Sequence, residues 1–117
     1  MIYLCSHDKA KTLDIDHKRI YSISGWAPPF WTDEGYQREI RLAPKKWIYD
    51  EYKKDGRVDL YSIRYTIEVL NKLNPKIILS QLATDPYLCC YEDWEFCHRH
   101  LVGEWFRLTL GEKIITL

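Results

Sequence analysis

The segment from Tyr87 to Leu108 constrains the fold of this chain more than any other. An apolar run, Tyr87 to Tyr91, leads into a polar loop, and from His98 onward apolar residues recur at helical spacing. The recurring residues are Leu101, Val102, Trp105, Phe106 and Leu108. This order predicts a buried strand, a loop and an amphipathic helix, which is the building unit of α/β proteins.

Further short runs predict strands at residues 2–5, 20–24 and 113–117, the last of them at a sheet edge. Pro44 can begin a helix that Asp55-Gly56 ends, and Asn74-Pro75 predicts a capped start for another helix. Between them a helix is predicted over 60–73, with an apolar stripe that we expect to face the core. The stripe consists of Leu60, Ile63, Ile67, Leu70 and Leu73.

Strands that alternate with helices predict a single three-layer α/β domain, in which a small, partly parallel sheet is flanked by helices. The chain has 117 residues, of which 46% are apolar. That length suits one domain with its own core, so we assign residues 1–117 to one domain.

The balance of charges excludes one broad class of function. Lys plus Arg equals Asp plus Glu at 17 each, so the formal net charge is zero. Extended nucleic-acid binding depends on many uncompensated basic groups and is therefore not expected. Aromatic residues make up 15% of the chain. They indicate either a core rich in aromatic rings or a surface on which rings stack. Exposed aromatic residues are also compatible with a homodimer.

The beginning of the chain is polar and no apolar run approaches membrane-spanning length, so we expect a cytoplasmic protein with no membrane segment. The four cysteines are Cys5, Cys89, Cys90 and Cys97. Their spacing does not resemble a disulfide framework, and we expect reduced thiols. His7 and His17 lie in a polar stretch and are expected at the surface.

A loop with three large rings follows the second predicted strand. Its sequence, Gly25-Trp26-Ala27-Pro28-Pro29-Phe30-Trp31, contains paired prolines, which predict irregular structure. Ligands of open α/β sheets bind beyond the carboxyl ends of the strands. We therefore expect this loop to contribute ligand contacts, from Ser24, Trp26, Pro28 and Trp31.

The Cys97-His98-Arg99 triplet stands at the start of the last predicted helix. The unpaired N–H groups there favour an anion, and they lower the pKa of a nearby cysteine. We predict Cys97, His98 and Glu92 as catalytic groups, and Arg99 and Cys90 as ligand-binding groups. Two alternatives stay open: Cys97 is an inert packed thiol, and Glu92 forms a salt bridge with Arg99 that only fixes the loop.

Two other chemistries fit the same segment poorly. A cysteine phosphatase loop needs five residues between Cys and Arg and glycines among them, whereas Arg99 follows Cys90 by nine positions without a glycine. A zinc site from Cys90, Cys97, His98 and His100 lacks regular spacing, and adjacent Cys and His ligands are awkward for one tetrahedral ion. We therefore predict no metal.

The run Leu88-Cys89-Cys90-Tyr91-Glu92, followed by Cys97-His98-Arg99, resembles the domain of unknown function 488 (DUF488) family. The likeness continues into residues 101–105 and, less specifically, to 2–6, 23–24, 42–44 and 61–73, so that it spans nearly the whole chain. Gly25-Trp26 departs from it, since related chains often carry a basic residue there. The resemblance implies an α/β fold with a site at the Cys-His-Arg element, and it implies no particular activity.

Together these features predict binding of a nucleotide-like or other phosphorylated planar small molecule, between the Cys-His-Arg helix start and the 25–31 loop. The sequence names no cofactor and leaves enzymatic turnover open. The alternative is a non-enzymatic module whose exposed aromatic residues bind a protein partner or sequester a ligand.

Overall fold

The computed structural model describes residues 1–91 and 97–117. Its strands are β1 (Ile2–Ser6), β2 (Ile20–Ser22), β3 (Gln37–Arg38), β4 (Tyr87–Cys90) and β5 (Ile114–Thr116). Its helices are α1 (His7–Ala10), α2 (Phe30–Asp33), α3 (Lys46–Asp55), α4 (Val58–Glu68), α5 (Pro75–Ser80) and α6 (Arg99–Leu110). Short 3₁₀ turns lie at His17–Arg19, Ile40–Leu42 and Leu70–Lys72.

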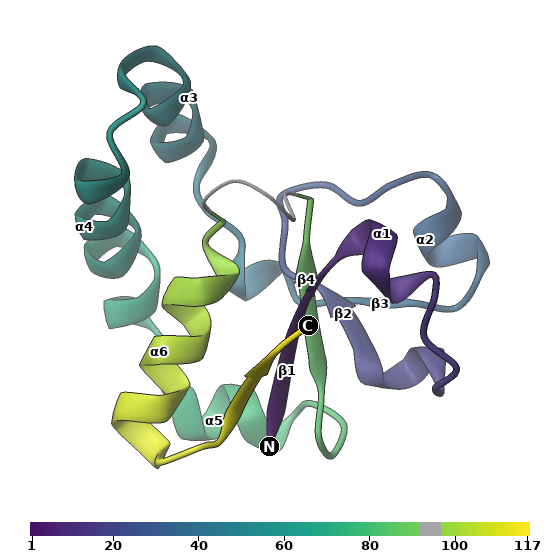
Figure 1. Cartoon of the computed structure of the whole chain (residues 1–117). Coiled ribbons are helices and arrows are strands. Elements are labelled where there is room, and N and C mark those ends of the chain that lie inside the picture. The colour runs from purple at the N-terminus through teal and green to yellow at the C-terminus, as the bar shows by residue number, and fades with distance from the viewer. Residues whose placement is uncertain (92–96) are drawn as a thin grey trace.

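The five strands form one sheet in the order β3-β2-β4-β1-β5, and each pairing in the described residues is parallel. Helices α3 to α6 lie on one side of this sheet, and α1 and α2 lie on the other (Figure 1). The predicted three-layer α/β domain is therefore confirmed, with β5 at a sheet edge. The predicted partly parallel sheet is parallel throughout its described pairings.

Strand alternation divides the core into two clusters, because successive side chains point to opposite faces of a sheet. Leu88 and Cys90 of β4 pack with α4, α5 and α6, together with Phe106. Tyr87 and Cys89 of the same strand pack on the other face with α1 and α2. The central strand β4 is buried on both faces, as expected for a parallel sheet covered by helices.

Local signals placed several helix ends correctly. The Asn74 side chain accepts hydrogen bonds from the N–H groups of Lys76 and Ile77, so it caps α5 as predicted. Gly56 and Gly111 follow α3 and α6 in the left-handed conformation that favours glycine at this position. The prolines of the 25–31 loop, in contrast, do not keep it irregular, because α2 begins at Phe30 directly after them.

The predicted core stripe on α4 is wrong in part. Ile63 and Ile67 are more than half exposed, whereas Tyr61 and Tyr65 form the buried face of this helix. The hydroxyl of Tyr65 donates to the carbonyl of Leu42, which satisfies its buried polar group. Aliphatic spacing therefore indicated the wrong face, because tyrosine can be buried when its hydroxyl finds a partner.

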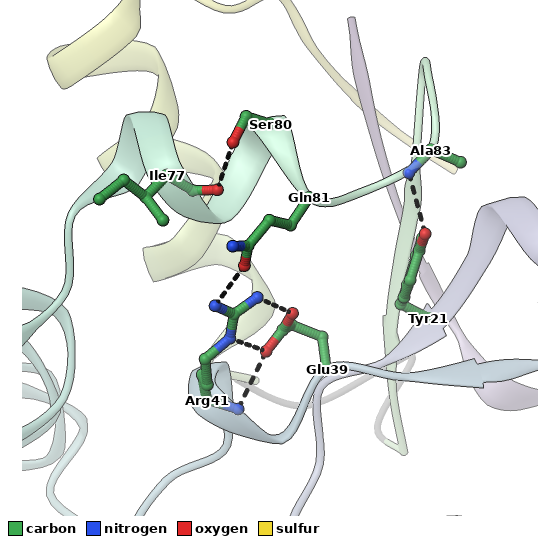
Figure 2. A network of polar contacts seen from close by, with 7 residues as sticks. All are labelled: Tyr21, Glu39, Arg41, Ile77, Ser80, Gln81 and Ala83. Atoms are coloured by element: carbon green, nitrogen blue, oxygen red, sulfur yellow. Dashed lines mark hydrogen bonds and ion pairs between the residues drawn. The ribbon is translucent and has the colours of Figure 1, made fainter.

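A network of polar contacts connects the end of α5 and the turn after it to β2 and to the segment after β3 (Figure 2). The Arg41 guanidinium donates to both carboxylate oxygens of the buried Glu39 and to the amide oxygen of Gln81. Nearby, the Ala83 N–H donates to the hydroxyl of Tyr21 from β2. These bonds hold the segment after β3 against the segment after α5.

Within the described residues, the helices are all too short or too polar to cross a membrane.

Candidate functional site

A pocket of about 540 Å³ lies where β2 and β4 end. This volume falls within the range of small-molecule sites. Chain segments far apart in the sequence line it: Ser24, Gly25 and Trp26; Pro44, Lys46, Tyr49, Asp50 and Tyr52; Tyr61; and Tyr91, Cys97 and His98.

The sheet topology explains why a pocket forms at this edge. Strands β2 and β4 are parallel neighbours, so their carboxyl ends meet. The chain leaves β2 toward α2 on one side of the sheet, and it leaves β4 toward α6 on the other (Figure 1). Such a divergence opens the crevice in which ligands of parallel α/β folds bind.

One wall of the pocket is the segment after β2. The Arg38 guanidinium of β3 donates to the carbonyls of Ser24 and Gly25 at 3.3 and 3.0 Å, which fixes the backbone there. The Trp26 side chain is 62% exposed, and its ring centroid lies 4.1 Å from that of Tyr91, with the planes tilted by 36°. A large ring is thus presented to the pocket from a restrained loop.

A second part of the pocket lining comes from α3 and α4. Tyr49 and Tyr52 stand three residues apart on α3, and Tyr61 follows on α4. The rings of Tyr52 and Tyr61 meet edge to face, with centroids 5.2 Å apart. Aromatic groups from two separate parts of the chain therefore line the pocket, which suits a flat ligand.

Fixed charges gather at the start of α3. The Lys46 ammonium lies 2.8 Å from the Asp50 carboxylate. This hydrogen bond raises the pKa of Lys46 and lowers the pKa of Asp50, so both are charged at neutral pH. Lys45, which precedes α3, makes no side-chain hydrogen bond to the first N–H groups of the helix. Those groups and Lys46 favour an anion at this end of the pocket.

His98 lies at the base of the pocket and is almost fully buried. Its Nε2 is 2.6 Å from the carbonyl oxygen of Ile23. Because a carbonyl only accepts, Nε2 carries the proton and Nδ1 keeps a free lone pair. Burial, opposed by the bond to Ile23 and assisted by the Arg99 charge, lowers the pKa of His98 to about 4. The imidazole is therefore neutral at physiological pH.

The cysteines next to His98 correct one prediction. The Sγ atoms of Cys90 and Cys97 lie at disulfide-bonding distance, and the Cα atoms of the two residues are 7.0 Å apart. Reduced thiols were predicted for all four cysteines, and this is wrong for the pair as it stands in the structure. Cys5 and Cys89 are free and buried. In the paired form Cys97 has no thiolate with which to act as a nucleophile.

The structure brings four of the predicted site residues to the pocket, namely Ser24, Trp26, Cys97 and His98. Trp31 lies elsewhere: it is fully buried among α1 and α2, and its indole N–H donates to the carbonyl of Gln37. Pro28, Cys90 and Arg99 also do not line the pocket. Glu92 lies outside the described residues.

Arg99 takes a position behind the pocket wall rather than in it. Its guanidinium is buried at the start of α6 and donates to the sulfur of Cys90 at 3.0 Å. Its positive charge adds to burial in lowering the pKa values of His98 and His100. It thus sets the electrostatic environment of the site from within the protein.

Sequence reasoning missed the wall formed by α3 and α4. The spacing of Tyr49 and Tyr52 on one helix, and the high number of tyrosines, were the available signals. They did not identify a site, because nothing in the sequence shows that this helix pair packs over the carboxyl ends of β2 and β4.

No family model, curated protein or solved structure matches the chain.

Proposed function

We propose that this protein binds a planar, phosphorylated small molecule of nucleotide-like size in the pocket at the carboxyl ends of β2 and β4. The observation that carries the proposal is that two aromatic groups line one pocket, Trp26 with Tyr91 and the tyrosines of α3 and α4. Base–aromatic stacking contributes about 1–3 kcal/mol per base and tolerates different bases.

The anionic part of the ligand belongs at the start of α3. Lys46 supplies an accessible cation, since its side chain is 89% exposed and, among the described residues, it pairs with Asp50 at the surface. A phosphate that reached Lys46 would exchange for that carboxylate and would also face the first N–H groups of α3. The ring and the phosphate of one ligand are thus recognised by different parts of the same pocket.

The proposal concerns binding and names no reaction. The catalytic roles of Cys97, His98 and Glu92, the DUF488 resemblance and the cytoplasmic location stay predictions. The alternative of a partner-binding module has less support, because the exposed ring of Trp26 and that of Tyr49 face a pocket.

The test is a titration followed by intrinsic tryptophan fluorescence, with adenosine, guanosine and uridine monophosphates and flavin mononucleotide as probes. We expect at least one mononucleotide to quench the fluorescence. Trp26→Ala should weaken its affinity about tenfold or more, the loss of one stacking partner. Trp47→Ala is the matched control, since Trp47 is another partly exposed tryptophan but does not line the pocket. Failure of all four probes at millimolar concentration would contradict the proposal.

A second pair of variants distinguishes the contribution of the phosphate to binding from the contribution of the ring. Lys46→Gln should weaken binding of the monophosphate and leave binding of the corresponding nucleoside unchanged. Lys54→Gln, on the same helix but outside the pocket, should change neither. Equal losses for nucleoside and nucleotide in Lys46→Gln would show that the anion is held elsewhere.

A further inference from the structure

Three donor atoms of soft-metal type converge beside the pocket, two of them from residues that line it. One ligand atom each from Cys90, Cys97 and His98 lies within 4.8 Å of the other two, and all three residues are buried. Cys90 ends β4, while Cys97 and His98 stand just before α6. The adjacency of Cys97 and His98, which argued against a metal in the sequence, therefore does not keep their donor atoms apart.

The orientation of His98 is the one that metal-binding histidines adopt. Its Nε2–H donates to the carbonyl of Ile23, and its unprotonated Nδ1 lies 3.7 Å from the Sγ of Cys97. Ligating histidines nearly always hold their second ring nitrogen against a carbonyl or carboxylate in this way, which fixes the tautomer and turns the lone pair toward the ion.

The sulfur of Cys90 has an outer partner of its own. The Arg99 guanidinium donates to this sulfur at 3.0 Å within the buried interior. Hydrogen bonds of this kind orient the ligands of metal sites. Arg99 thus supplies an outer hydrogen bond to one prospective ligand, as the Ile23 carbonyl does to another.

We propose that the reduced Cys90–Cys97 pair and His98 form a zinc-binding site. Two thiolates and a neutral imidazole are donors that zinc prefers, at about 2.3 Å for sulfur and 2.0–2.1 Å for nitrogen. The Cα separation of 7.0 Å lies at the upper limit for a disulfide. The proposal goes beyond the ligand assigned to the pocket and does not depend on it.

Formation of the site from the paired form requires a two-electron reductant. A phosphine supplies the two electrons and becomes a phosphine oxide with oxygen from water, whose two protons leave Cys90 and Cys97 as thiols; two thiols of another molecule achieve the same by becoming a disulfide. Zinc then displaces both thiol protons into solvent as it binds. The metal and the disulfide are therefore mutually exclusive states of the same two sulfurs.

Three protein ligands leave one position of a tetrahedral ion unfilled. Cys97 and His98 line the pocket, so the cluster adjoins the space in which a small molecule would lie. A closed structural site would need a fourth protein ligand. Among the described residues, the cluster with metal-binding spacing contains only these three.

The experiment is native mass spectrometry of the protein with zinc, after reduction by a phosphine in the absence of oxygen. We expect one zinc ion per reduced chain and none on the chain whose Cys90 and Cys97 are disulfide-bonded. Cys97→Ser should weaken zinc binding by about 100-fold or more, since even outer-sphere changes cost about 10–100-fold. Zinc uptake by Cys97→Ser at wild-type affinity, or none by the reduced wild type, would overturn the proposal.

Cys89→Ala is the matched control. Cys89 precedes Cys90 on β4 but points to the opposite face, beside Cys5. The Cys89→Ala variant should bind zinc as the wild type does. Loss of zinc binding in this variant alone would overturn the assignment of ligands.

The absorption spectrum of bound cobalt(II) can be recorded on the wild-type protein, so this test does not depend on whether the variants fold. Cobalt bound to the reduced wild type should show the thiolate charge-transfer absorption of a sulfur-ligated tetrahedral ion. Cobalt binding without that absorption would overturn the proposal even if every cysteine variant failed to fold.

Discussion

At the scale of the residue, burial decides what each side chain can do, and residue type indicates it only in part. Trp26 and Trp31 lie in the same short segment, yet the first is largely exposed and the second is fully buried. His7, predicted at the surface, is buried and hydrogen-bonded to the hydroxyl of Ser22. The sequence therefore indicated the loop but could not show which of its rings lines the pocket, because that depends on the packing of α1 and α2.

Glu39 and Arg41 give a prediction at this scale. The Glu39 carboxylate is 7% exposed and receives the Arg41 guanidinium on both oxygens (Figure 2). Arg41→Leu leaves this carboxylate without its cation, and we expect a loss of about 2 kcal/mol in the free energy of unfolding. Urea denaturation measures the loss. In the double variant Glu39→Leu and Arg41→Leu, much of it should be restored, and a simple sum of the two single losses would contradict the coupling.

At the scale of the element, local chemistry predicted helix ends well and buried faces less well. Asn74 and Gly56 were identified from the sequence because capping needs only neighbouring residues. The strand β3 was missed, since it has two residues and both are exposed. Its contribution to the site, the Arg38 bonds to the segment after β2, was missed with it.

Gly103 provides a prediction at this scale, because α6 approaches the sheet closely there. A Cβ atom at this position would lie 2.7 Å from a terminal methyl group of Leu4 on β1 and 3.1 Å from Ile114 on β5. Gly103→Ala gains about 1 kcal/mol in helix propensity, but overpacking costs about 1–3 kcal/mol. We expect a net loss of about 1 kcal/mol in urea denaturation.

A compensating variant checks this explanation. Leu4→Val removes a methylene from the residue that the new methyl group would strike. The cost of Gly103→Ala should therefore be smaller in the Leu4→Val background than in the wild type. An unchanged cost would show that the contact with Leu4 is not its cause.

At the scale of the whole molecule, the sheet order determines where the pocket lies. The sequence predicted the layers because alternating strands and helices have few packing solutions. It did not predict that β4 enters between β2 and β1, or that α3 and α4 close over the carboxyl ends of β2 and β4. Those features depend on long-range packing, which local sequence patterns do not show. The site was therefore predicted only in part: four of the predicted residues line the pocket, and its tyrosines on α3 and α4 were not predicted.

The pH dependence of stability is also a property of the whole molecule. Burial lowers the pKa values of His7 and His98 to about 4 each, from 6.5 for an exposed histidine. The unfolded chain therefore takes up protons below pH 6.5 that the folded chain does not, and stability falls as pH is lowered from 6.5 toward 4. Each histidine contributes about 1 kcal/mol per pH unit in this window.

Urea denaturation between pH 7.5 and pH 5 measures this slope, in a range above the titration of most carboxylates. His7→Gln should reduce the slope, because glutamine does not titrate. A stability that stays constant from pH 7 to pH 5 would show that the two imidazoles are not buried in the neutral form.

We propose above that the pocket at the ends of β2 and β4 binds a planar anionic molecule. The most direct test is a ¹H–¹⁵N correlation spectrum recorded during titration with adenosine monophosphate, in which each tryptophan indole N–H gives its own signal. We predict that the indole signal of Trp26 and the amides of Ser24, Gly25 and Tyr49 shift together, while the indole signals of Trp31 and Trp47 stay in place. Shifts confined to the exposed face of α4 around Ile63 and Ile67, or no shifts at millimolar nucleotide, would contradict the claim.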